Sequence, residues 1–289
     1  MPNDSNNLID VEDLWVKFPT RTGMFDAVRG VSFSLGKERL GIVGESGSGK
    51  SMTGRALLRL IRKPGIVTAK RMSLHGEDLM AKSERQMRKV RGQQISMVMQ
   101  DPKFSLNPVM TIGEQIMEAY SLHAKGSKKA AKEKALEMLR AVSIRDPERV
   151  FRAYPHEMSG GMGQRVMIAM MLAPDPEILI ADEPTSALDV SVQGQVLSIM
   201  DKLVEERGMG LILISHDLNL VSSFCDRVLI MYAGRIVETC RADQLQQAQH
   251  PYTRGLLNSL PRLDQPKRRL DVLQREASWR DASSVVDAS

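Results

Sequence analysis

The first third of the chain alternates short apolar stretches with Gly, Pro and charged residues, a pattern typical of β-strands. Five stretches fit this description: residues 11–18, 28–35, 40–43, 71–74 and 94–99. If residues 11–18 form a regular strand, Trp15 and Phe18 face opposite sides, and one of them packs inward. Residues 51–61 place Leu57, Leu58 and Ile61 on one apolar stripe, which predicts a helix that ends before Pro64-Gly65.

The period becomes helical between residues 111 and 149, where apolar residues recur three and four positions apart. They form two stripes, one of Ile112, Ile116, Ala119 and Tyr120 and one of Ala135, Leu136, Leu139 and Val142. The lysines of residues 125–134 lie between the stripes, and we assign them no function because charge runs are usually solvated faces. The Met-rich residues 158–171 are expected to form a packed helix.

Two later segments are continuously apolar, as strands buried in a parallel sheet are. They are residues 178–181 and 211–214, and a helix is predicted over residues 193–206 between them. Two further strands are predicted on either side of Ala233-Gly234, as a hairpin. Because strands and helices alternate, we expect an α/β fold with a parallel core sheet, an N-terminal antiparallel β part and an inserted helical subdomain.

Composition limits the class of protein. The 289 residues are 42% hydrophobic and 26% charged, as in a folded domain, and no apolar run approaches the roughly 20 residues that cross a bilayer. The polar N-terminus lacks a signal-peptide pattern, so we expect a cytosolic protein unless a partner holds it at a membrane. Cys225 and Cys240 are expected to be reduced packing thiols. The net charge of +5 could suit nucleic acid, but only 4% of residues are aromatic, and we predict no nucleic-acid partner.

The strongest local motif is G-E-S-G-S-G-K-S at residues 44–51, directly after the predicted strand 40–43. It matches the phosphate-binding pattern G-x-x-x-x-G-K-S, in which backbone N–H groups surround phosphates, Lys50 neutralises them and Ser51 ligates Mg²⁺. The residues expected to contact ATP here are Gly44, Glu45, Ser46, Gly47, Ser48, Gly49, Lys50, Ser51 and Met52. For the pattern alone, the alternative is a Gly/Ser-rich surface loop.

Polar residues end the two predicted core strands. Asp182 and Glu183 follow residues 178–181, and His216 follows residues 211–214. At the sheet edge beside a phosphate loop, Asp182 is suited to complete the Mg²⁺ ligands begun by Ser51, and Glu183 to polarise the attacking water. His216 is expected to reach the γ-phosphate, although a lone histidine is more often structural.

Together these segments resemble the ATP-binding subunit of an ABC (ATP-binding cassette) transporter over residues 8–260. Residues 44–51 resemble its Walker A motif, Gln100 the Q-loop glutamine, Ser159-Gly160-Gly161-Met162 the signature, residues 178–183 the Walker B motif, Ser186-Ala187-Leu188-Asp189 the D-loop and His216 the switch histidine. The resemblance implies that Phe18 stacks on adenine and that Gln100 contributes to catalysis and to Mg²⁺ binding. It also implies that Ser159, Gly160 and Gly161 contact the ATP of a facing subunit.

Within that family the chain resembles the dipeptide/oligopeptide and nickel importers. The residues that carry this likeness are Asp101-Pro102, Ser105-Leu106-Asn107-Pro108, Met162 and His250-Pro251-Tyr252-Thr253-Arg254. Two signature positions depart from it, since Gly163 stands where Arg is usual and Met158 where Leu is common. The tail after Pro261 has no cysteine cluster, so no iron–sulfur site is expected.

The resemblance implies a cassette over residues 1–260, with a helical subdomain at about 105–173, and a partly flexible C-terminal extension over residues 261–289. Its expected partners are two membrane-spanning permease subunits, a second ATPase or a second copy paired head to tail, and indirectly an extracytoplasmic solute-binding protein. The expected place is the cytoplasmic face of the inner membrane, as a peripheral protein. Import of peptides is favoured over import of nickel or a metal chelate, and both over a soluble ATPase of DNA repair or translation.

Overall fold

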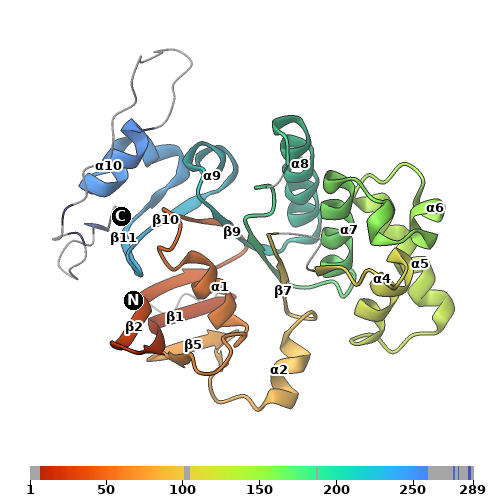
Figure 1. The fold of residues 1–289 in the computed structure, drawn as a ribbon, viewed down its shortest axis with the longest axis horizontal. Helices are drawn as coiled ribbons and strands as arrows, with labels where there is room; N and C mark the ends of the chain where they lie inside the picture. The colour runs from red at the N-terminus through yellow and green to blue at the C-terminus, as the bar shows by residue number, and fades with distance from the viewer. Residues whose placement is uncertain are drawn as a thin grey trace. The chain divides into compact units, whose positions relative to one another are not determined.

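The computed structural model describes residues 7–100, 105–186 and 188–259, together with Glu276, Trp279, Val286 and Asp287. They form two compact units (Figure 1): the terminal unit, from described residues within 1–81 and 212–289, and the middle unit, from described residues within 82–211. No helix among these residues is long and apolar enough to cross a membrane. Asp101-Pro102, Ala187 of the predicted D-loop and most of the predicted C-terminal extension lie outside the described residues.

The N-terminal sheet of the terminal unit is antiparallel, as predicted. Its strands are, in sheet order, β2 (Gly23–Leu35), β1 (Ile9–Thr20), β5 (Arg71–Leu74) and β6 (Glu77–Asp78), with β4 (Ile66–Thr68) also paired to β1. Leu14 and Val16 of β1 are buried, together with Val28 and Val31 of β2. The sheet therefore uses the apolar alternation of the sequence to build one side of the core.

Strand β1 is irregular, and neither of its two aromatic residues is fully buried. Its pairing with β2 shifts register three times, first around Asp13, whose φ is 53°. Trp15 and Phe18 are both half-buried, and Trp15 Nε1 donates to Asp13 Oδ1 at 2.8 Å. The expectation that one of the two aromatics packs into the core is wrong, since both side chains stay partly exposed where the regular pairing of β1 is interrupted.

The second sheet of the terminal unit carries the phosphate loop. The strands of this sheet that lie wholly or partly in the terminal unit are, in order, β12 (Val286–Asp287), β11 (Arg235–Arg241), β10 (Arg227–Tyr232), β3 (Arg39–Val43) and β9 (Gly210–Ser215), which begins in the middle unit. β10 is parallel to β3 and antiparallel to β11, which confirms the hairpin predicted at Ala233-Gly234. The helices of this unit are α1 (Lys50–Leu57), α9 (Leu218–Phe224), the 3₁₀ helix η2 (Ala242–Gln247) and α10 (Pro251–Asn258).

The middle unit contains a parallel strand pair and most of the helices. β7 (Ile95–Val98) and β8 (Ile178–Asp182) are buried along their whole length and pair in parallel, as their apolar sequences predict. The helices are α2 (Glu84–Val90), α4 (Ile112–Ser121), α5 (Lys128–Ala141), α6 (Pro147–Arg152), the 3₁₀ helix η1 (Pro155–Glu157), α7 (Gly160–Leu172) and α8 (Val190–Arg207). Helices α4 to α7 pack on one another (Figure 1).

Local signals explain where these helices begin and which side they bury. Thr111 caps α4 and forms a capping box with Glu114, and the Ser127 side chain caps α5. Ile112 and Ile116 of the first predicted stripe are buried, as are Ala135 and Leu139 of the second. Parts of both stripes therefore lie in the core that these helices share.

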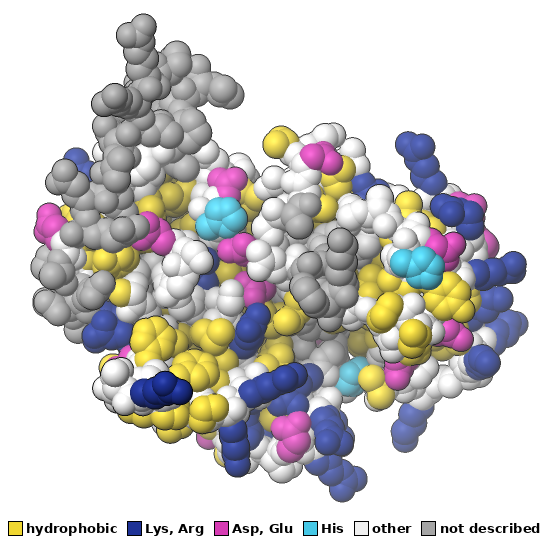
Figure 2. Space-filling model, viewed as in Figure 1, with side chains coloured by type: hydrophobic (Ala, Val, Ile, Leu, Met, Phe, Trp, Pro, Cys, Tyr) yellow, Lys and Arg dark blue, Asp and Glu magenta, His cyan; other side chains and the backbone are white. Residues whose placement is uncertain are grey.

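The basic stretch of residues 125–134 is largely a solvated face, as expected. Lys125, Lys128, Lys129 and Lys132 are exposed, and Figure 2 shows many Lys and Arg side chains on the surface of this part of the chain. Lys134 differs, since its Nζ lies 2.9 Å from Asp175 Oδ2. It therefore ties α5 to the turn after α7.

Both cysteines are buried and free. Burial raises the pKa of Cys225 to about 12 and that of Cys240 to about 11, so both stay protonated near neutral pH. A buried thiol of high pKa is a poor nucleophile, which agrees with the packing role expected of them.

The packing of α9 on β3 leaves no room for a side chain at Gly41. A Cβ added there would lie 2.2 Å from Val221 Cγ1 and 3.2 Å from Cys225 Sγ. We expect Gly41→Ala to lower the free energy of unfolding by about 1–3 kcal/mol through overpacking, measured by urea denaturation.

Two further variants control this measurement. Val221→Ala makes room for the new methyl group, so the double variant should lose less stability than the two single losses added together. Gly194 is an exposed position in α8 with nothing within 4 Å of an added Cβ, and Gly194→Ala should instead stabilise by about 0.5–1 kcal/mol. A Gly41→Ala protein as stable as the wild type would contradict the close contact.

Candidate nucleotide-binding site

The predicted phosphate loop joins the end of β3 to the start of α1. Two of its glycines let the loop approach neighbouring backbone more closely than any side chain would permit. A Cβ on Gly44 would lie 2.1 Å from the Met231 carbonyl oxygen, and one on Gly49 would lie 2.5 Å from that of Ala27. Gly49 also has a φ of 101°, which favours glycine.

The polar groups of the loop suit an anion. Gly49 is the N-cap of α1 and no side chain caps the helix, so the positive end of its dipole serves the loop. Ser48 Oγ is buried and has no hydrogen-bond partner among the described residues. Lys50 is only 4% exposed, and its Nζ donates to Gly44 O at 2.7 Å and to Glu45 O at 2.9 Å. Phosphate oxygens are the acceptors that such donors bind, so the loop fits a nucleoside triphosphate.

Other predicted residues of the loop lie where the motif requires. Ser46 and Gly47 form the exposed bend of the loop, and Ser51 and Met52 follow in the first turn of α1, both half-buried. Glu45 is the second residue of the loop, and its N–H donates to the hydroxyl of Tyr252 in α10 at 3.1 Å. Tyr252 belongs to a stretch that resembles the family, but no local pattern predicts this contact.

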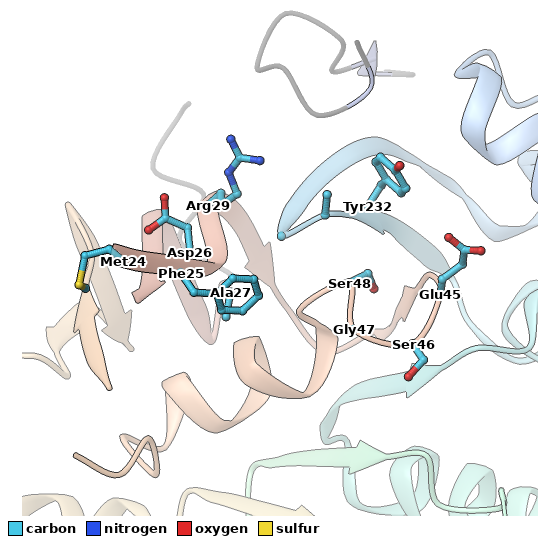
Figure 3. Close-up of a pocket in the computed structure, with 12 residues that line it drawn as sticks. Met24, Phe25, Asp26, Ala27, Arg29, Glu45, Ser46, Gly47, Ser48 and Tyr232 are labelled. Carbon is cyan, nitrogen blue, oxygen red and sulfur yellow. The ribbon is translucent and has the colours of Figure 1, made fainter. Parts of the chain in front are cut away.

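A hollow of about 650 Å³ opens beside the loop (Figure 3). Its walls come from β2, the loop and the turn between β10 and β11. Phe25, at 57% exposure, points from β2 toward the loop, and Arg29 and Tyr232 also line the hollow. Phe18, expected from the family resemblance to stack on adenine, is the cross-strand partner of Phe25 but does not line the hollow. Phe25 precedes the strand predicted over residues 28–35, so no sequence pattern singled it out.

The acidic residues lie in the middle unit. Asp182 is the last residue of β8 and is 3% exposed, whereas Glu183 is half-buried and has a φ of 48°. The Gln100 amide Nε2 donates to Glu183 Oε2 at 3.2 Å. The structure thus brings together Gln100 and Glu183, two residues that the sequence assigned to one site from positions far apart in the chain.

The signature residues open α7. Ser159 is its N-cap, and its Oγ accepts a hydrogen bond from Met162 N at 3.4 Å. Gly160 and Gly161 follow in the first turn, and a Cβ on Gly161 would lie 2.4 Å from Val192 Cγ1 of α8. A second hollow, of about 640 Å³, is lined by these residues and by Asp189 at the start of α8. Three arginines also line it: Arg145, Arg149 and Arg165.

The last residues to be located are His216 and the two unusual signature positions, Met158 and Gly163. His216 is exposed directly after β9 and belongs to the terminal unit, whereas Asp182, Glu183 and Gln100 belong to the middle unit. Gly163 is buried within α7, and Met158 is half-buried just before it. The arginines of the second hollow were not predicted, because they lie in segments whose sequence pattern indicates helical packing.

A buried strand, a glycine-rich turn with its lysine and an uncapped helix start define a P-loop nucleoside triphosphatase. Comparison with known families narrows this class. Residues 28–186 match the family model described as ABC transporter, and residues 237–284 match the one described as oligopeptide/dipeptide transporter, C-terminal region. The chain belongs to the ABC transporter family, and within it the chain is an ATPase.

Individual relatives support the same family assignment. The oligopeptide transport ATP-binding protein OppD of Bacillus subtilis is 50% identical over 260 residues, covering 89% of this chain and 73% of the relative. The dipeptide transport ATP-binding protein DppD of Haemophilus influenzae is 47% identical over 269 residues, covering 92% and 82%. A dimeric ATP-binding cassette bound to ADP and Pi superposes with a TM-score of 0.70 at 26% identity, covering 81% of this chain and 98% of that one. The fold predicted from the sequence is confirmed.

The two aromatic partners, Phe18 and Phe25, can be separated by substitution. We expect Phe25→Ala to weaken ATP binding by about 1–3 kcal/mol, the scale of base–aromatic stacking, measured by titration calorimetry. Phe18→Ala is the matched control, because it removes the same ring from the same cross-strand pair but not from the hollow, and its loss should be smaller. The reverse order would assign the stacking role to Phe18.

Proposed function

We propose that this chain is the ATP-hydrolysing subunit that powers import of di- and oligopeptides through an ABC transporter. The observation that carries the proposal is the match of residues 237–284 to the C-terminal region of oligopeptide/dipeptide transporters. OppD and DppD, which are transport ATP-binding proteins for oligopeptides and dipeptides, support it. Import of nickel or a metal chelate is the second candidate, but neither of these relatives favours it.

In the proposed site the loop residues 44–52 bind the phosphates of ATP. Lys50 neutralises the β- and γ-phosphates, and the N–H groups at the start of α1 donate to their oxygens. Ser51, Asp182 and Gln100 offer the hard oxygen ligands that Mg²⁺ prefers, and the ion would neutralise charge that builds on the phosphates. The ring of Phe18 or Phe25 covers the adenine.

We assign hydrolysis to Glu183 and supporting roles to Gln100 and His216. The Glu183 carboxylate accepts a proton from the attacking water while the water oxygen bonds to the γ-phosphorus and the bond to the ADP oxygen breaks. The hydrogen bond from Gln100 Nε2 to Glu183 Oε2 orients that carboxylate. His216 donates to the γ-phosphate and helps to hold it in line.

The proposed assembly is a head-to-tail pair of cassettes, with this chain facing a second ATPase or a second copy. Ser159, Gly160 and Gly161 at the start of α7 then serve the ATP of the facing subunit, and the arginines of the second hollow add positive charge there. The similar cassette bound to ADP and Pi is itself a dimer, which supports this arrangement.

We further propose the partners and the place of the cassette pair in the cell. Two permease subunits hold the cassette pair as a peripheral complex at the cytoplasmic face of the inner membrane, and a solute-binding protein delivers cargo from outside. Residues 1–260 form the cassette, with the helical subdomain at about 105–173, and residues 261–289 extend it. We propose no nucleic-acid partner for this chain.

Uptake assays test the cargo. In a host strain that lacks this gene, uptake of radiolabelled dipeptides and oligopeptides should fall, and the wild-type chain should restore it. The Glu183→Gln chain is the matched control and should not restore it. Unchanged peptide uptake together with reduced ⁶³Ni uptake would instead assign the transporter to nickel.

Glu183→Gln also tests the catalytic assignment. The substitution keeps the size of the side chain but removes the proton acceptor, so ATP should still bind while hydrolysis falls by about 10²–10⁴-fold. With ATP and Mg²⁺ the variant should elute as a cassette pair in size-exclusion chromatography, either with a second copy of itself or with a second ATPase subunit. Hydrolysis at the wild-type rate would remove Glu183 from the mechanism.

A further inference from the structure

Tyr252 is completely buried in α10, and its hydroxyl contacts the backbone of the phosphate loop. Its hydroxyl accepts a hydrogen bond from Glu45 N–H at 3.1 Å. That N–H belongs to the same peptide group as the carbonyl of Gly44, which accepts from Lys50 Nζ at 2.7 Å. Because a trans peptide is planar, its N–H and C=O point in opposite directions. Tyr252 therefore holds one side of a peptide whose other side holds the lysine of the loop.

Aromatic rings fix the Tyr252 side chain. The Tyr232 ring centroid lies 4.5 Å from that of Tyr252, and the Trp279 centroid lies 6.0 Å from both. Trp279 is itself buried, and Tyr232 also lines the hollow beside the loop. The Tyr232 ring is tilted against that of Tyr252, and Trp279 meets both edge-on, which restricts rotation of the Tyr252 ring. The hydroxyl of Tyr252 is thus held at a defined place.

The backbone of Tyr252 is fixed as well. Its N–H donates to Nδ1 of His250, the N-cap of α10, at 3.1 Å. Glu238 Oε1 in β11 accepts from the backbone N–H groups of Gln249, at 2.6 Å, and His250, at 3.3 Å. Burial lowers the pKa of His250 more than the neighbouring Glu238 raises it, so the ring stays neutral and Nδ1 remains an acceptor.

We propose that Tyr252 is a positioning residue for ATP binding, whose hydroxyl orients the Gly44–Glu45 peptide and, through the Gly44 carbonyl, Lys50. The proposal rests on ATP binding at the loop and is independent of the cargo. It gives the matched C-terminal region, residues 237–284, a part in the nucleotide site. The region supplies Glu238, His250, Tyr252 and Trp279, which together form one support for the loop.

Tyr252→Phe in the purified full-length chain tests this, because it keeps the ring and removes the acceptor. We expect the Kd for ATP to rise about three- to tenfold, the effect of one hydrogen bond, and KM for ATP to rise alike while kcat stays within about twofold. Thr253→Val is the matched control. The Thr253 hydroxyl is buried on the same helix and has no partner among the described residues, so ATP affinity should not change.

A second variant removes the donor instead of the acceptor. Glu45→Pro deletes the N–H together with the carboxylate, and Glu45→Ala, which loses the carboxylate but keeps the N–H, is its control. Relative to Glu45→Ala it should raise the Kd for ATP by the same factor, and Tyr252→Phe should add nothing in that background. The proposal is overturned if Tyr252→Phe leaves the Kd within twofold of the wild type, or if its effect persists in full beside Glu45→Pro. Failure of peptide uptake would leave these affinities untouched.

Discussion

The phosphate loop lies between two strands from opposite ends of the chain, closer to both than any side chain would allow. Gly44 lies against the carbonyl of Met231 in β10, and Gly49 against that of Ala27 in β2. Hydrogen bonds also link the loop to both strands through the turn after β10, since Gly234 N donates to Ser48 O and Arg29 N donates to Gly234 O. The loop cannot move without breaking both strands' contacts, so its N–H groups are ordered in advance, and a nucleotide spends little of its binding energy on arranging them.

The residues that bind and the residues that react are assigned to different units of the chain. The terminal unit holds the loop and His216, and the middle unit holds Asp182, Glu183 and the signature. Within the middle unit the left-handed backbone at Glu183 gives two adjacent carboxylates different environments. Asp182 stays in the buried strand, whereas Glu183 leaves it half-buried, where water has access. Two neighbouring acids thereby become suited to different tasks.

The sequence predicted the core strands and the motifs because each depends on local pattern. Continuous apolar runs identified β8 and β9, and glycine spacing identified the loop. Short elements were missed: α2 and α9 have seven residues each, too few for a clear helical period, and α1 ends at Leu57 rather than residue 61. Contacts between distant segments could not be predicted either. Neither the bulge at Asp13 nor the contacts of Phe25 and Tyr252 with the region of the loop follow from local sequence pattern.

The size of the Tyr252 contact limits what the C-terminal region can do to the site. One hydrogen bond is worth about 0.5–1.5 kcal/mol, or roughly a threefold to tenfold change in an equilibrium constant. Switching a site from mostly closed to mostly open takes about 10⁴-fold, far more than this contact supplies. The region can therefore adjust how tightly ATP is held but cannot turn binding on and off by this route. Larger control must come from contacts in which several hydrogen bonds and charges change together, such as those of the proposed cassette pair.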